Sequence, residues 1–410
     1  MHEGHAVNIV FVNPEYPSRS VQDHGGIATY IYSMANALAT AGNTVHILAK
    51  SKTVPDALAA GVKFHTFDHA PIPRMFPWLV RLTADDTVWE RGFSLAARNL
   101  ILEIHRTVPV DIVEIAEYNG LAFEFSAPLP FPVVVHFHTS TEIIDQYNAR
   151  KPTGRLRRWY AFEAHALKRA QSFRCPSLSL KQEVCRRYGI PDALVCVIPH
   201  PIDAAPFDAI NRREEKKTKV DILFTGRLER RKGGEILRRD IHRVLSLDPR
   251  INLTFAGEMD MGEAGDFRNP IERSLTEQQR HRMWLLGPTK RSDLPVLYRH
   301  SDIFLIPSLF ENAPYALLEA MAARLPVIGS NTSGIAELIR HEENGLLFDP
   351  EDPDGLVSCI STMISRAGLA ANCARKAYDD VKRINDPAAI ALAALSYYDG
   401  VIRSFSQQRT

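Results

Sequence analysis

Cysteine is scarce in this sequence, and no motif pairs the cysteines that are present. The chain of 410 residues has five, an odd number, widely spaced and never at C-x-x-C spacing. Neither a zinc knuckle nor a disulfide framework is therefore indicated. We expect reduced thiols in a cytoplasmic protein.

Long hydrophobic runs are also missing. No apolar stretch of the sequence reaches the roughly 20 residues that span a bilayer. Residues 1–5 lack the basic start and apolar stretch of a signal peptide. We therefore expect neither a membrane-spanning helix nor a signal peptide.

An excess of charge of one sign is absent as well. Lys and Arg number 49 and Asp and Glu number 48, which gives a formal net charge of +1. A non-specific nucleic-acid binder would usually be basic, so no nucleic-acid partner is expected. The motifs G-x-S-x-G and H-E-x-x-H are missing too, so serine-hydrolase and zinc-protease chemistry have no support.

What is present is an alternation of strand and helix patterns. Residues 7–12 form an apolar strand, residues 27–38 carry apolar side chains at helical spacing, and residues 44–48 form the next strand. This order predicts a βαβ unit with parallel strands. Residues 132–137 are a further apolar run, typical of a strand buried on both faces.

The second half repeats this logic after a charged stretch at residues 211–219. Further strands are predicted at residues 221–224, 252–256, 284–286, 303–306 and 327–329. We predict an α/β fold of two Rossmann-like, doubly wound domains, residues 1–203 and 204–386, followed by a helix at 387–405. Because open parallel sheets bind ligands at the carboxyl ends of their strands, an interdomain cleft is the expected site.

The strongest local feature is a strand, a loop and a helix around two carboxylates. Glu311 lies in the loop after strand 303–306, and Glu319 lies in the helix that opens at Pro314. Free N–H groups of the first helical turn can bind an anion. Carboxylates at two depths suit two hydroxyl-bearing parts of one ligand better than a retaining carboxylate pair. The alternative interpretation is two solvated acids.

Two further segments could meet phosphate groups. Arg227 and Lys232 follow a strand that ends at Gly226, and a guanidinium with an ammonium can neutralise a diphosphate. Gly25 and Gly26 precede the first helix, where glycine allows close approach of a ligand to the backbone. The alternatives are a solvated basic helix start and a simple turn.

Two histidines mark the end of the strand at residues 132–137. His136 and His138 share one face, and His138 lies nearer the carboxyl end, where an imidazole can donate a hydrogen bond or move a proton. A metal would need more ligands, and no third is apparent nearby, so no metal site is expected. A structural histidine is the alternative.

Together these segments resemble the retaining glycosyltransferases of family 4, which have the GT-B fold. Residues 311–322 match the family's E-x(7)-E signature and continue into 326–329, and residues 226–228 with 232–233 match its G-R-L…K-G segment. Residues 25–42 are similar to the family's opening. The resemblance extends from about residue 8 to residue 352.

The sequence departs from the family pattern at two places. Arg324 stands where the family usually has glycine before Leu-Pro, so that helix end must be capped differently. His200-Pro201 replaces the Asn-Gly of the family's I-P-N-G-x-D segment, of which Ile198, Pro199 and Asp203 are retained.

The resemblance implies a nucleoside diphosphate sugar donor, UDP- or GDP-linked, held mainly by the second domain without a tightly bound cofactor or metal. Arg227 and Lys232 would meet the diphosphate, Glu319 the ribose, and Glu311 the donor sugar. The helix at 387–405 would complete the first domain. The implied catalytic residues are His138, Arg227, Lys232 and Glu311, and the implied donor-binding residues are Gly25, Gly26, Arg227, Lys232, Glu311, Asn312, Ala313, Pro314, Tyr315 and Glu319.

We therefore predict transfer of a hexose-type unit to a hydroxyl of a sugar or lipid-linked acceptor, in cell-envelope, exopolysaccharide or glycolipid synthesis. A sugar-nucleotide epimerase or hydrolase, and a non-catalytic carbohydrate- or nucleotide-binding relative, remain alternatives.

The basic, aromatic segment 151–170 suggests a peripheral contact with the inner face of a membrane. A solvated face over a packed stripe is favoured, because Glu163 and His165 dilute the charge. Nothing in the sequence indicates an oligomeric state.

Overall fold

The computed structural model describes residues 6–13, 25–49, 58–67, 86–126, 128–168, 170–208, 218–258 and 266–409. The chain forms two compact units. Unit 1 comprises residues 1–144, 151–201 and 387–410, and unit 2 comprises residues 145–150 and 202–386. The sequence places a boundary after residue 203, close to this division, but it assigns residues 145–150 to the first domain.

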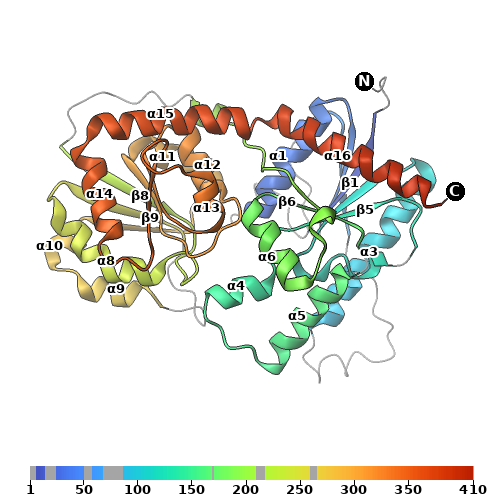
Figure 1. Ribbon diagram of the computed structural model, residues 1–410, viewed down its shortest axis with the longest axis horizontal. Helices are drawn as coiled ribbons and strands as arrows, with labels where there is room; N and C mark the ends of the chain where they lie inside the picture. Colours follow the sequence, from blue (N-terminus) through green and yellow to red (C-terminus); the bar gives the residue numbers. More distant parts are fainter. Residues whose placement is uncertain are drawn as a thin grey trace. The chain divides into compact units, whose positions relative to one another are not determined.

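Unit 1 contains a sheet of seven strands in the order β3-β2-β1-β4-β5-β6-β7. The paired strands are all parallel, and the apolar runs of the sequence form its centre (Figure 1). The order reverses between β1 and β4, where open α/β sheets bind ligands. The strands are β1 (Asn8–Asn13), β2 (Thr44–Ala49), β3 (Val62–Thr66), β4 (Ile112–Ala116), β5 (Val133–His136), β6 (Ser172–Cys175) and β7 (Val195–Val197).

The helices of unit 1 pack their apolar faces on this sheet. The last helix of the chain, α16, lies beside α1 (Figure 1). The sequence predicts a helix within 151–170, and α5 occupies the central part of that range. The helices are α1 (Gly26–Thr40), α3 (Asp86–Thr107), α4 (Thr141–Tyr147), α5 (Gly154–Leu167), α6 (Leu178–Tyr188) and α16 (Pro387–Gln407), with short 3-10 turns η1 (Tyr118–Gly120), η2 (Phe123–Ser126) and η3 (Asp192–Leu194).

Unit 2 contains a second sheet, in the order β10-β9-β8-β11-β12-β13, again with parallel pairs throughout. Its order reverses between β8 and β11. β11 spans the same residues as the strand predicted from the sequence. The strands are β8 (Val220–Thr225), β9 (Ile251–Ala256), β10 (Met283–Gly287), β11 (Ile303–Ile306), β12 (Val327–Ser330) and β13 (Leu346–Phe348).

Helices cover both faces of the second sheet. α8, α9 and α14 bury one apolar cluster against it, while α11 and α12 contact β8, β11 and β12. α12 begins one residue later than expected, with Pro314 as its N-cap. The helices are α7 (Ala205–Asp208), α8 (Gly234–Leu247), α9 (Arg268–Ser274), α10 (Glu277–Arg280), α11 (Leu294–His300), α12 (Tyr315–Ala322), α13 (Ser333–Leu338), α14 (Gly355–Ser365) and α15 (Ala367–Ile384), with the 3-10 turn η5 (Arg291–Asp293).

Within the described residues, no single helix has both the length and the hydropathy of a membrane span. One pair passes that test when its helices are joined, α14 with the run from Ala367 to Gln407, and it is bent by 100°.

Candidate functional site

In unit 2, two loops meet at the point where the strand order reverses. One loop follows β8 and carries Lys232, and the other follows β11 and carries Glu311. Gly233 makes their approach possible, because its φ is +91° and a β-carbon there would lie 2.3 Å from the carbonyl oxygen of Pro307. Glycine is therefore required directly after Lys232 for a steric reason.

Lys232 and Glu311 form the centre of this site. The Lys232 ammonium pairs with Oε1 of Glu311, which also accepts a hydrogen bond from Ser308 Oγ at 3.2 Å. Burial raises the pKa of Glu311, but Lys232 and Arg231 outweigh it, so the pKa is lowered overall. Glu311 is only 5% exposed, so its interpretation as a solvated loop acid is wrong.

Arg231 is a second cation of this site, buried where Lys232 is partly exposed, and sequence reasoning missed it. Its Nη2 lies 2.7 Å from Glu229 Oε1, and its Nη1 donates to the Phe310 carbonyl at 3.1 Å. Asn148 holds both partners, since it donates to Glu229 at 3.1 Å and accepts from the Arg231 amide at 2.8 Å. No local pattern marks Arg231 as buried, because Phe310 and Asn148, which complete its contacts with the neighbouring Glu229, come from distant segments.

Arg227, the expected partner of Lys232, stays outside this network. Its side chain is exposed, and no ion pair joins it to another residue that the structure describes. The sequence predicted that this loop carries the cations of the site; the structure buries Arg231, leaves Lys232 partly exposed and exposes Arg227.

The second expected carboxylate, Glu319, is buried inside unit 2. It is 3% exposed, and it accepts a hydrogen bond from the Tyr298 hydroxyl at 3.0 Å. Arg291 lies 3.1 Å from its other oxygen. Burial raises the pKa of Glu319, and Arg291 and Tyr298 oppose this. The interpretation of Glu319 as a solvated helix acid is wrong.

The loop that leads into α12 is held from behind by the start of α13. The Glu311 amide donates to Ser333 Oγ at 2.9 Å, and the Gly334 amide donates to the Glu311 carbonyl at 2.9 Å. A β-carbon at Gly334 would lie 1.7 Å from the Asn312 carbonyl oxygen, so only glycine fits. Asn312, Ala313, Pro314 and Tyr315 thus form a braced turn at the N-terminus of α12.

Unit 1 places Gly25 and Gly26 at the start of α1. Both are exposed, and Gly25 is the N-cap in an extended conformation with φ −72°. The backbone therefore does not need glycine at position 25. An exposed helix start without side chains leaves its N–H groups accessible to an anion.

His138 lies in unit 1 on a short loop after β5. The Glu117 carboxylate accepts hydrogen bonds from the amides of His138 at 2.8 Å and Thr139 at 2.7 Å. Thr139 has a φ of 140°, an uncommon value for a residue with a β-carbon. Glu117 compensates this strain, so it is a positioning residue for the loop.

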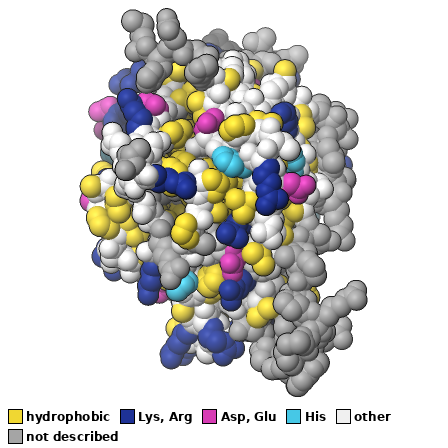
Figure 2. Space-filling model, turned by 90° about the vertical axis from the view of Figure 1, so that its right-hand side faces the viewer, with side chains coloured by type: hydrophobic (Ala, Val, Ile, Leu, Met, Phe, Trp, Pro, Cys, Tyr) yellow, Lys and Arg dark blue, Asp and Glu magenta, His cyan; other side chains and the backbone are white. Residues whose placement is uncertain are grey.

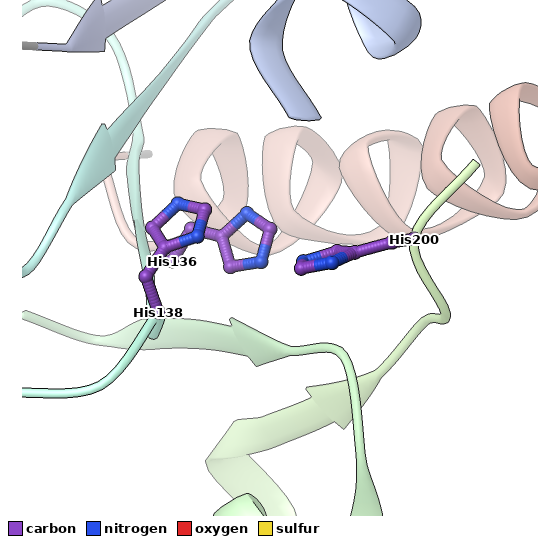
Figure 3. Close-up of side chains that lie close together, drawn as sticks. All are labelled: His136, His138 and His200. Carbon is purple, nitrogen blue, oxygen red and sulfur yellow. The ribbon is translucent and has the colours of Figure 1, made fainter. Parts of the chain in front are cut away.

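The structure brings a third histidine to His136 and His138. His200, from the loop after β7, lies with them so that one ring nitrogen of each is within 4.8 Å of the others (Figure 3). The statement that no third ligand is nearby is therefore wrong. The only sign of this residue in the sequence was that His200 replaces the asparagine of the family pattern. Its spatial neighbours cannot be deduced from local patterns.

Two family models match the chain in succession. The model described as Glycosyltransferase Family 4 matches residues 24–205. The model described as Glycosyl transferases group 1 matches residues 207–380. The two matches adjoin near the division between the two units.

Similar proteins include an uncharacterized glycosyltransferase of Methanocaldococcus jannaschii, 27% identical, with 92% of this chain and 93% of that protein covered. A glycogen synthase of Mycobacterium tuberculosis is 25% identical, with 96% and 94% covered.

Solved structures share the fold at lower identity. Sucrose-phosphate synthase from Thermosynechococcus elongatus has a TM-score of 0.74 at 19% identity and covers 97% of this chain and 100% of that one. Anabaena HepE in complex with UDP and glucose has a TM-score of 0.68 at 18% identity and covers 96% and 100%. Taken with the two parallel sheets and the two family matches, these likenesses show that the chain is a GT-B glycosyltransferase and belongs to the family 4, group 1 glycosyltransferases.

Proposed function

We propose that this glycosyltransferase moves a hexose-type unit from a nucleoside diphosphate sugar to an acceptor hydroxyl, with retention of the anomeric configuration. The observation that carries the proposal is the ion pair between the partly exposed Lys232 and the buried Glu311 where the strand order of unit 2 reverses. A donor similar to the UDP and glucose bound by HepE would suit this site. UDP or GDP is the nucleotide we expect.

Each group of the site then has a separate task. Lys232 exchanges its carboxylate partner for diphosphate oxygens and stabilises the charge of the leaving nucleotide. Glu311 is released to bind hydroxyls of the donor sugar, and Glu319 binds ribose hydroxyls in place of Arg291. Arg227, exposed on the same loop, supplies a further cation to the diphosphate. Gly25 and Gly26 of unit 1 are also proposed as donor-binding residues. His138 is the proposed contact to the reacting sugar.

Replacing Lys232 tests this assignment. We expect Lys232→Ala to lower kcat by about 100-fold or more, the usual cost of losing one group that stabilises transition-state charge. Arg238→Ala is the matched control, because Arg238 is a cation of the adjoining helix α8 with an exposed partner, Glu235. Circular dichroism of both variants checks folding. Turnover near that of the unaltered enzyme in folded Lys232→Ala contradicts the proposal.

The donor is identified by a thermal-shift screen with UDP, GDP, ADP and their sugar conjugates. A ligand that binds only the folded state raises Tm in proportion to its binding free energy. We expect UDP or GDP and the matching sugar conjugate to give the largest shift. Products then distinguish the alternatives, because transfer leaves a new glycosidic bond, hydrolysis leaves free sugar and nucleotide, and a binding protein leaves the donor intact.

We further propose a cytoplasmic enzyme whose helix α5 touches an anionic membrane and whose acceptor is lipid-linked, in cell-envelope or exopolysaccharide synthesis. The sequence argument against this contact was dilution of charge by Glu163 and His165, but Glu163 is 2% exposed and adds no charge to the surface. The ionised side chains that α5 exposes are therefore three arginines, Arg155, Arg157 and Arg158, beside the exposed ring of His165. Basic side chains gather at the lower edge of the face in Figure 2, at the height of α5 in Figure 1.

Liposome co-sedimentation tests the contact. Each Lys or Arg near an anionic surface contributes about 1 kcal/mol. We expect binding to vesicles that contain anionic lipid, and its loss in the variant Arg155→Gln/Arg157→Gln/Arg158→Gln. Arg375→Gln, an exposed arginine of α15 in unit 2, is the control. Sedimentation at background with anionic lipid removes this part of the proposal.

A further inference from the structure

His136, His138 and His200 form a buried cluster in unit 1. Their exposed fractions are 1%, 7% and 3%. His136 and His138 stand at the end of β5, two residues apart on one face, and the ring of His200 is directed toward them (Figure 3). The ring of Tyr30 closes one side, with its centroid 4.4 to 5.3 Å from the three imidazole centroids.

The carboxylate of Glu114 fixes how His136 presents its nitrogens. Glu114 accepts from Arg174 at 3.1 Å and from the hydroxyls of Tyr30 and Tyr398, both at 2.5 Å. A carboxylate paired with a guanidinium is ionised and only accepts hydrogen bonds, so Nδ1 of His136, at 2.9 Å, carries the proton. The lone pair of neutral His136 is therefore on Nε2.

That lone pair lies inside the protein. His136 Nε2 is buried and has no hydrogen-bond partner among the residues that the structure describes. A buried acceptor without a partner is costly, which calls for a ligand at this position. In protein metal sites, a carboxylate commonly accepts a hydrogen bond from one ring nitrogen of a histidine and so orients the other ring nitrogen toward the metal. Glu114 and His136 have this arrangement.

The charge around the cluster permits a cation. Arg174 is a fixed positive group beside the cluster, with its guanidinium carbon 5.4 Å from the Tyr30 ring centroid. Glu114 balances that charge directly through the ion pair. The fixed charges of Arg174 and Glu114 beside the three imidazoles therefore cancel, so this pair adds no net positive charge that would repel a cation there.

We propose that His136, His138 and His200 bind one divalent transition-metal ion, zinc being the best match. Three neutral imidazoles suit Zn²⁺ among the common protein metals, and three protein ligands leave a fourth position open for water or an anionic oxygen. Zn–N bonds of about 2.0 to 2.1 Å place ligand nitrogens about 3.3 Å apart, so side-chain rotations must close the present spacing. The site shares His138 with the proposed contact to the reacting sugar, but the contacts, burial and spacing that carry it are independent of the proposed glycosyl transfer.

Metal binding by the full-length chain tests the proposal directly. The protein is stripped with a chelator, mixed with ZnCl₂, passed through gel filtration and analysed for zinc by mass spectrometry. We expect one zinc ion per chain, and with CoCl₂ the visible absorption bands of a four-coordinate site. His200→Asn should lose both signals, and asparagine is what the family pattern has at that position, so folding is expected to persist. His165→Asn, an exposed histidine of α5, is the matched control.

A second variant separates ligation from packing. Glu114→Gln keeps an oxygen near His136 but weakens its orienting hydrogen bond, and such changes cost about 10- to 100-fold in metal affinity. If this variant does not fold, Tyr398→Phe, which removes one partner of the same carboxylate, takes its place with a smaller expected loss. No zinc retained by the unaltered chain, or equal retention by His200→Asn, overturns the proposal. Both readouts are independent of enzymatic activity.

Discussion

Glu163 shows how strongly the surroundings of one residue change its chemistry. It belongs to α5, a helix of basic and aromatic residues, but its side chain is turned into unit 1. It accepts hydrogen bonds from Thr141 Oγ1 at 2.7 Å, the Thr141 amide at 3.1 Å and the Trp159 indole at 3.2 Å. The carboxylate therefore joins α5 to the start of α4, and it contributes no negative charge to the exposed face.

This burial predicts a pH dependence of stability. Burial raises the pKa of Glu163 from 4.5 to about 7. Because the folded state binds the proton more tightly than the unfolded state, this stabilising contribution is complete below about pH 4.5 and is lost as the pH rises through 7. Glu163→Gln cannot ionise, so its stability relative to the unaltered chain should rise by on the order of 2 kcal/mol between pH 5 and 8.

Urea unfolding at a series of pH values measures this difference. Glu103→Gln, which removes an exposed carboxylate of α3, serves as the control and should leave the pH profile unchanged. A constant difference between Glu163→Gln and the unaltered chain from pH 5 to 8 would show that Glu163 is ionised throughout.

At the scale of the element, the end of α12 explains the departure at Arg324. The Leu325 amide donates to the Ala320 carbonyl and the Arg324 amide to the Met321 carbonyl, each at 3.0 Å, which is the Schellman motif. Arg324 occupies the left-handed position with φ 55°, where glycine is usual. Its guanidinium lies 3.9 Å from the Tyr378 ring centroid on α15, which offsets the strain.

Two substitutions at Arg324 separate strain from contact. Arg324→Ala keeps a β-carbon in the left-handed conformation and loses the ring contact, so it should lower the free energy of unfolding by about 1 kcal/mol. Arg324→Gly also loses the contact but relieves the strain, so it should be about 1 kcal/mol more stable than Arg324→Ala. Thermal and urea unfolding compare the two. Equal stability would mean that the backbone strain is negligible.

Some elements could be predicted from local sequence and others could not. β11 is an uninterrupted apolar run, and its bounds follow from the pattern alone. β6 was not predicted, because it contains Arg174, a charged residue that is fully buried. Its burial depends on Glu114, 60 positions away, and on Tyr398, 224 positions away. Local patterns carry no information about such partners.

The residues of the candidate site also fall into two groups, those that local sequence predicts and those that depend on distant partners. Lys232, Glu311 and Glu319 were predicted as site residues because each lies at a fixed distance from a strand end or a helix start, and the structure pairs the first two. Arg231 and His200 were not, since Asn148 accepts from the Arg231 amide across a long sequence separation and His200 meets histidines from another strand. What the sequence cannot supply is the contact between segments that are distant in the chain.

At the scale of the whole molecule, the chain completes unit 1 last. It leaves unit 1 after residue 201 and returns at residue 387, where α16 begins. α16 places Tyr398 on Glu114, in the middle of the first sheet, and Tyr397 on the Phe173 carbonyl at 2.8 Å. The ion pair of Glu114 and Arg174 is therefore fully bonded only once the end of the chain has been made.

Two neighbouring tyrosines test this dependence. Tyr398→Phe removes a hydrogen bond to a buried carboxylate, which contributes about 1.5 to 3 kcal/mol, whereas Tyr397→Phe removes a neutral bond of about 0.5 to 1.5 kcal/mol. Hydrogen exchange followed by mass spectrometry should show faster exchange in β4 and β6 for Tyr398→Phe, and a smaller effect for Tyr397→Phe. Peptides of β8 and β11, which lie in unit 2, should exchange as in the unaltered chain. Equal effects of the two substitutions would mean that the hydrogen bond to the buried Glu114 carboxylate contributes no more than the neutral bond to the Phe173 carbonyl, which contradicts this dependence.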